Sequence, residues 1–169
     1  MASRRRGIVA GLTASAVHGA KWVEFFAPFE ILQTNRNPLP GIRVHGDRID
    51  DDGIVWLEGV PVTTPARTAL DLGCWYGTDA AVAAIDALLN AVDLKPADVE
   101  SIAQRYPARR EIRGAWTALG LADAGSQSPK ETWLRLLLIR AGLPRLQTQI
   151  PVLDECGEAF AYLDMGGKK

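Results

Sequence analysis

The sequence is poor in the residues that most often bind metals or crosslink secreted proteins. It contains two cysteines, Cys74 and Cys156, and two histidines, His18 and His45. The cysteines are far apart and form no CxxC pair, which argues against a structural zinc site. Because two distant cysteines are typical of proteins from a reducing compartment, we predict that both thiols are reduced and that the protein is cytosolic.

A strong charge imbalance and long apolar runs are also missing. Nineteen Lys and Arg face twenty Asp and Glu, a net charge of −1, so binding to nucleic acid would require a local basic patch. No apolar run approaches the roughly 20 residues of a membrane span. Arg4 to Arg6 before residues 8–17 imitate an export signal, but Gly11, Thr13 and Ser15 interrupt the run. We therefore predict a cytoplasmic protein that does not bind membranes.

The chain is 47% hydrophobic and 23% charged, enough for one sizeable core or two small ones. Periodicity predicts an α+β fold in which a small antiparallel sheet precedes a helical middle. The predicted strands are 29–32, 42–45, 54–58 and 60–62, and the predicted helices of the middle are 79–91, 96–105 and 109–122. The acids between the second and third strands lack the downstream Glu of an EF-hand, so we expect a solvated turn at Asp47 and residues 50–52.

The most specific short motif is VTTPARTALDLG, residues 62–73. Thr64 is a good N-cap, Pro65 suits the first helical position, and Arg67 precedes Asp71 by four residues, so the two can pair. The motif resembles the strand-to-helix signature of AbiEi-type antitoxins and of Vsr-like relatives, matched here at Pro65, Arg67, Thr68 and Asp71. Residues 11–23 are similar to a helix of the same proteins. For Arg67 we weigh an internal pair against a contact with a partner and favour the pair.

Residues 126–164 predict a helix followed by a hairpin. Ser128, Pro129 and Glu131 form a capping box at the start of the helix. An apolar stripe follows at helical spacing, at Trp133, Leu134, Leu137, Leu138 and Ala141. Two alternating runs then flank turn residues 154–157, and Phe160, Tyr162 and Asp164 fall on one face of the second strand.

This helix, strand, strand order resembles the opening of a PD-(D/E)XK nuclease core of the Vsr-like family, a partial restriction-endonuclease-like fold. The resemblance implies that Glu131 and Asp164 are catalytic residues and Mg²⁺ ligands. The third strand, which carries a further acid and often a Lys, is absent, since the chain ends at Lys169. We therefore expect an incomplete site, no bound Mg²⁺, no nuclease activity and a chain shortened at both ends. The capping box alone would also explain Glu131.

The basic residues near Tyr106 and Trp116 form the one basic and aromatic cluster of the sequence: Arg105, Arg109, Arg110 and Arg113. Such a cluster can contact a phosphate backbone. A solvated helix face is the alternative reading, and the one we prefer.

The predicted organisation is an AbiEi-antitoxin-like region at 1–122, a linker at 123–127 and a partial Vsr-like domain at 128–169. Three functions remain open. The first, which we favour, is a DNA-associated protein of the Vsr-like endonuclease-domain family that has lost catalysis. The second is an antitoxin-like module that binds a toxin protein of the nucleotidyltransferase type or DNA. The third is a nuclease completed when another chain adds a strand. The sequence gives no expectation for the oligomeric state.

Overall fold

A mixed five-stranded sheet forms one end of the molecule. A computed structural model describes residues 7–24, 27–34, 40–144 and 146–167. In these residues the strands are β1 (Ile8–Val9), β2 (Phe29–Leu32), β3 (Ile42–His45), β4 (Ile54–Leu57) and β5 (Val60–Thr63), in the order β3-β2-β1-β5-β4. The predicted strand positions are confirmed.

The prediction of a wholly antiparallel sheet is wrong. β2 pairs in parallel with β3, and β1 pairs in parallel with β5, whereas β1–β2 and β4–β5 are antiparallel. An alternating apolar pattern indicates a half-buried strand, but it does not show whether the neighbouring strand runs parallel or antiparallel to it. β1 was not predicted, because two residues are too few to show alternation.

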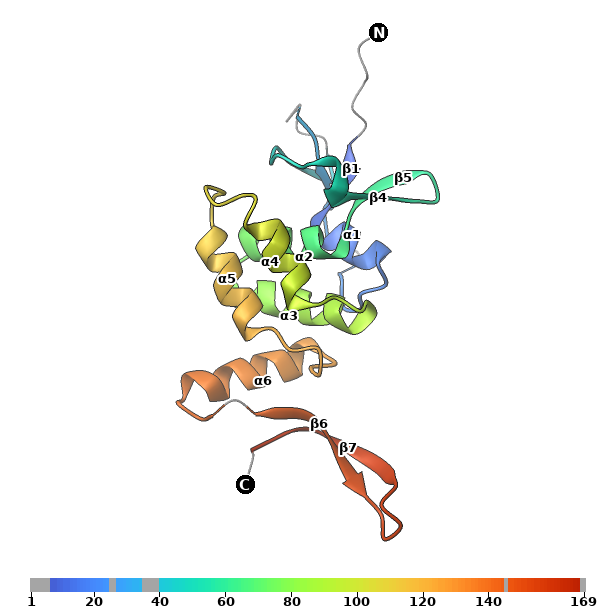
Figure 1. Ribbon diagram of the computed structural model, residues 1–169, viewed down its shortest axis with the longest axis vertical. Coiled ribbons are helices and arrows are strands. Elements are labelled where there is room, and N and C mark those ends of the chain that lie inside the picture. Colours follow the sequence, from blue (N-terminus) through green and yellow to red (C-terminus); the bar gives the residue numbers. More distant parts are fainter. Residues whose placement is uncertain (1–6, 25–26, 35–39, 145, 168–169) are drawn as a thin grey trace.

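Helices make up the middle of the molecule, below the sheet in Figure 1. They are α1 (Gly11–Val17), α2 (Pro65–Trp75), α3 (Thr78–Ala91), α4 (Pro96–Ala103) and α5 (Ile112–Leu121), followed by α6 (Pro129–Arg140). A short 3-10 turn, η1 (Asp51–Gly53), precedes β4. The α+β class is thereby confirmed. None of the helices in the described part of the chain has the length and apolar character needed to cross a bilayer.

The central helix of the main core is α2. It packs against α1, α3, α4 and α5, and its residues 66–74 are all buried. Its start follows the prediction: the Thr64 side chain accepts a hydrogen bond from the N–H of Arg67, and Pro65 is the first helical residue. Gly73 allows the close approach of α5, because a Cβ there would lie 2.8 Å from the Cα of Ala115.

The C-terminal part consists of α6 and a separate two-stranded sheet, β6 (Gln147–Leu153) and β7 (Ala159–Gly166). In both upright views this hairpin lies at the end opposite the five-stranded sheet, with α6 between it and the other helices. Asp154 closes the turn by accepting hydrogen bonds from the N–H groups of Cys156 and Glu158. The predicted helix and hairpin are confirmed.

The buried face of α6 is not the predicted one. Trp133, Leu134 and Leu137 are exposed, whereas Thr132, Arg135 and Leu136 are buried where the helix packs on α3. The prediction used apolar spacing, but here buried hydrogen bonds, described below, determine which face turns inward.

The α2–α5 contact predicts a strong difference between two glycines. Gly73→Ala should destabilise the protein by about 1–3 kcal/mol, because its Cβ meets backbone that cannot move easily. Gly120→Ala, on the open side of α5 where a Cβ meets nothing within 4 Å, should be neutral or stabilising. Urea unfolding of both variants measures the difference, and equal midpoints would contradict the close packing.

Candidate functional site

Two arginines share one buried carboxylate at the centre of the helical core. Arg67 Nε donates to Asp71 Oδ1 at 2.8 Å, the predicted pair along one face of α2. Arg109, from the segment before α5, places Nη1 2.7 Å from the same oxygen. Arg109 is itself only 6% exposed. Together with Asp47, which lies 3.5 Å from Arg109 Nε, these residues form what we call the arginine–aspartate cluster.

Aromatic rings cover both guanidinium groups of the cluster. Arg67 lies over the ring of Tyr106, 5.0 Å from its centroid, and Arg109 lies over Trp75 at 5.6 Å. Cation–π contacts of this length are favourable, and more so when water is excluded. The cluster is therefore a buried positive site with one central acid and two aromatic walls.

The acidic loop before β4 closes the cluster on the sheet side. Asp47 accepts a hydrogen bond from Trp75 Nε1 at 3.0 Å, and Asp50 accepts one from the Tyr106 hydroxyl at 2.8 Å, which lowers the pKa of Asp50. Asp52 pairs with Arg105. The expectation of a solvated turn is wrong at Asp47 and Asp50, whose partners lie far away in the sequence, whereas Asp52 is exposed as expected.

Hydrogen bonding within the cluster is incomplete. Nη1 and Nη2 of Arg67 and Oδ2 of Asp71 are buried without a hydrogen-bond partner among the described residues. Buried polar groups are nearly always paired, and exceptions concentrate at functional sites. The neighbouring thiol is no nucleophile, because burial raises the pKa of Cys74 to about 11. The cluster can therefore orient the elements that it joins, and the thiol beside it is not activated.

A second buried acid lies beside the cluster. Glu30, on β2, accepts hydrogen bonds from the N–H of Leu12 at 2.7 Å and from His45 Nε2 at 3.0 Å. His45 in turn stacks on Trp75, with ring centroids 3.4 Å apart. Burial alone would raise the pKa of Glu30, but the hydrogen bonds from His45 and Leu12 outweigh it and lower this pKa. A continuous polar layer thus joins the sheet to α2.

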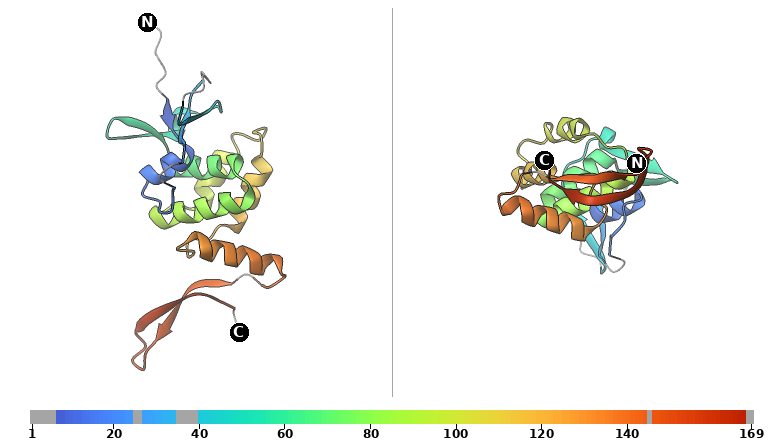
Figure 2. Two further views of the ribbon diagram at one scale, coloured as in Figure 1. Left: turned by 180° about the vertical axis from the view of Figure 1, so that it is seen from behind. Right: turned by 90° about the horizontal axis from the view of Figure 1, so that it is seen from below.

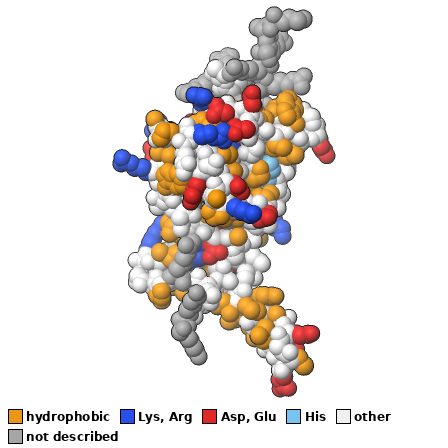
Figure 3. Space-filling model, in the orientation of Figure 1, with side chains coloured by type: hydrophobic (Ala, Val, Ile, Leu, Met, Phe, Trp, Pro, Cys, Tyr) orange, Lys and Arg blue, Asp and Glu red, His pale blue; other side chains and the backbone are white. Residues whose placement is uncertain are grey.

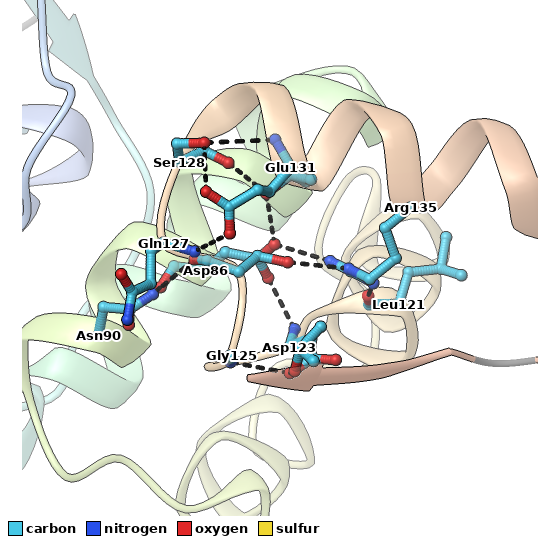
Figure 4. Close-up of polar contacts among 12 residues, drawn as sticks. Asp86, Asn90, Leu121, Asp123, Gly125, Gln127, Ser128, Glu131 and Arg135 are labelled. Carbon is cyan, nitrogen blue, oxygen red and sulfur yellow. Dashed lines mark hydrogen bonds and ion pairs between the residues drawn. The ribbon is translucent and has the colours of Figure 1, made fainter. Parts of the chain in front are cut away.

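A separate polar network joins α6 to α3 and is fully paired (Figure 4). Arg135 projects from α6 towards Asp86, and Nη2 donates to its carboxylate at 2.7 Å. Its other nitrogens donate to Ser126 Oγ and to the carbonyl of Leu121. Asp86 also accepts from the hydroxyl of Thr132 and the N–H of Asp123. Each of the three nitrogens of this buried guanidinium group donates to an acceptor, as expected for a structural joint.

A cavity of about 330 Å³ opens beside this joint. Its lining includes Lys21 and Trp22, which follow α1, as well as Asn90 of α3 and Ser128 at the start of α6. Trp22 Nε1 donates to the carbonyl of Gln127, and Asn90 donates to the carbonyl of Ser126. The walls are held by these contacts between the helical middle and the 126–128 segment.

The two predicted metal ligands lie in different settings. Ser128 caps α6 as predicted, because its hydroxyl accepts a hydrogen bond from the N–H of Glu131. The other half of the predicted capping box differs: the Glu131 carboxylate accepts from the N–H of Gln127 and the hydroxyl of Ser128, and not from the N–H of Ser128. Asp164 is exposed on β7. Within the described ranges, no group of three or more His, Cys, Asp or Glu side chains could hold a metal ion. Binding of Mg²⁺ by Glu131 and Asp164, and catalysis by them, stays a prediction.

The four predicted nucleic-acid contacts do not form one patch. Arg109 is buried in the arginine–aspartate cluster, and this corrects its place in a surface patch. Arg105 is exposed and pairs with Asp52, Arg110 points to solvent near Glu111, and Arg113 is exposed on α5. Nucleic-acid contact by these three stays a prediction.

Removal of the shared acid, Asp71, should destabilise the protein strongly. Asp71→Ala leaves two buried cations without their common partner, and we expect a loss of about 3–5 kcal/mol in the free energy of unfolding. Asp52→Ala removes an acid from an exposed pair and should change it by no more than about 1 kcal/mol. Equal denaturation midpoints for the two variants would show that the cluster adds nothing to stability.

Glu30 should make the free energy of unfolding depend on pH. Because folding lowers its pKa below the ordinary 4.5, the carboxylate stabilises the fold above that pH, and this stabilisation disappears as the pH falls through the lowered value. The Glu30→Gln variant should be less stable at pH 7 and should lose less on acidification to pH 3. Urea midpoints across this range test it, with Glu100→Gln on the exposed side of α4 as the unchanged control.

Comparison with known proteins places these features in a family. The chain is 30% identical over 135 residues to two uncharacterized proteins of Mycobacterium tuberculosis, from strains CDC 1551 / Oshkosh and ATCC 25618 / H37Rv. The aligned region is 76% of this chain and 48% of theirs, so the chain spans about half the length of these curated relatives. No solved structure matches significantly.

The family match concerns the sheet and the helical middle. Residues 7–121 match the model of the AbiEi antitoxin C-terminal domain, which covers the arginine–aspartate cluster and ends before α6. Neither this match nor the mycobacterial relatives support the Vsr-like part of the resemblance. The chain belongs to the AbiEi antitoxin C-terminal domain family.

Proposed function

We propose that this chain is an antitoxin-like module that binds a toxin protein of the nucleotidyltransferase type. The main support for this proposal is the family match over residues 7–121, which includes the whole five-stranded sheet and α1–α5. An antitoxin domain implies a toxin partner.

The hairpin formed by β4 and β5 is the surface that we assign to the toxin. Trp56 on β4 is 63% exposed, and Val60 on β5, which pairs with Leu57, is also exposed. Apolar side chains gather over this hairpin at the upper right of Figure 3. Exposed tryptophans are common energetic centres of protein interfaces. Trp22 is similarly exposed, but its indole N–H already donates to Gln127.

The buried polar layer supports this role by holding the sheet rigid. Asp47 is bound by both Trp75 and Arg109, so the loop leading to β4 is fixed on the helices. A surface that is ordered before the partner arrives loses less entropy on binding. The cluster thus acts through the shape of the β4–β5 surface.

Association with DNA is the second candidate. It is favoured by Arg110 and Arg113, which are exposed near the half-exposed Trp116 on α5, a basic and aromatic surface that suits a phosphate backbone. A metal-dependent nuclease built on Glu131 and Asp164 would require further ligands for Mg²⁺.

Co-expression with the toxin tests the proposal. Tagged wild-type chain should retain the toxin in a pull-down and restore growth, and Trp56→Ala should weaken retention by roughly 30-fold, the effect of a 2 kcal/mol hot spot. Trp133→Ala is the matched control, since Trp133 is 61% exposed but lies outside the matched domain.

The alternatives predict other results. If the toxin is not retained, and duplex DNA is bound in a manner abolished by Arg110→Glu, the DNA reading replaces the antitoxin reading. If Trp133→Ala weakens retention as much as Trp56→Ala, the toxin does not bind specifically at the β4–β5 hairpin.

A further inference from the structure

Among the described residues, the outer edge of β7 in the C-terminal hairpin pairs with no other strand. β7 pairs with β6 on one side, and the two strands form a sheet of their own. Two-stranded sheets are marginally stable in water, and an unpaired edge is a template for a further strand. Both features make the outer edge of β7 a candidate interface.

The two outer edges of the hairpin differ in their capacity to pair. Pro151 on β6 lies opposite Tyr162 on β7. Because proline has no N–H, the two residues must form a non-hydrogen-bonded pair, in which the backbone N–H and C=O groups point away from the partner strand. The outer edge of β6 therefore lacks a donor at Pro151, whereas Tyr162 directs its N–H and C=O outward from β7. β7 is the edge that can accept a strand.

The exposed side chains of β7 include aromatic and apolar residues of the kinds found in protein interfaces. Phe160 is 69% exposed and Tyr162 is 59% exposed, and Leu163, on the opposite face, is also exposed. Figure 3 shows apolar side chains along this hairpin up to its acidic turn. Each aromatic side chain can bury about 150–250 Å². Two copies would thus contribute several hundred Å² towards the roughly 1,200 Å² of a specific interface.

The charge pattern of β7 suits pairing with itself. Antiparallel pairing centred on Leu163 sets Tyr162 of each copy opposite Asp164 of the other, and no like charges face each other directly. Ala161–Gly166 contains no proline or lysine, the residues that most often protect edges. A two-fold axis through Leu163 makes the same surface serve both copies.

We propose that the β7 edge is an interface between two copies of this chain, which pair antiparallel through residues 161–165 and join their hairpins into one four-stranded sheet. The inference goes beyond the proposed function and does not depend on it, since these residues lie outside the family match.

Light scattering after size exclusion tests the proposal. Wild-type chain should show about twice the 18.3 kDa of one copy at high concentration. Tyr162→Pro removes the outward N–H without removing a bond to β6, and should reduce the mass to that of one copy. Tyr162→Val, which keeps that N–H and loses only the aromatic ring, should still dimerise. Circular dichroism checks that both variants are folded.

Hydrogen exchange on the wild type gives an answer even if Tyr162→Pro fails to fold. The amides of Tyr162 and Asp164 should exchange at least tenfold more slowly at high concentration than on dilution. A wild-type mass of one copy at all concentrations would overturn the proposal, as expected if a different protein supplied the strand. The same conclusion follows if Tyr162→Pro dimerises as strongly as Tyr162→Val.

Discussion

The placement of one acid, Asp71, between two buried guanidinium groups is the constraint on which the matched domain depends. Arg67 fixes the acid along α2, and Arg109 brings in the segment before α5. Through Arg109 and Trp75 the same centre also fixes Asp47 in the loop ahead of β4. Sheet and helices are thus joined by charge as well as by the apolar core, and a cation left without this acid would remain in a medium that solvates it poorly.

The ionic groups around Arg135 and Arg67, both buried, differ in completeness. Arg135 has an acceptor for every side-chain nitrogen, and its network sets the position of α6 on α3. Arg67 keeps two nitrogens without a protein acceptor among the described residues. A complete network specifies one packing arrangement, whereas buried polar groups without a partner cost free energy and are exceptions in folded proteins. The first is therefore a joint, and the second is the candidate site.

Local signals were sufficient for some of the structure. Thr64 and Pro65 predicted the start of α2, Ser128 and Glu131 predicted the cap of α6, and four-residue spacing predicted the Arg67–Asp71 pair. Contacts between distant residues had no such signal, so the parallel strands and the Asp47–Trp75 bond were missed. For Asp86 and Arg135 a hint existed: each is a charge set among apolar helical residues. It indicated a buried polar contact but could not identify the partner.

The joint between α3 and α6 restricts how this chain can vary. Asp86 lies inside the family-matched region, whereas Arg135 lies beyond it. While α6 covers α3, loss of Arg135 alone would leave the carboxylate of Asp86 buried without its cation, so substitutions at the two positions should be coupled. In a homologue without α6 the same position would lie at the surface, where an acid needs no cation. An acid at the position of Asp86 together with an arginine at the position of Arg135 would therefore identify homologues whose α6 packs in the same way.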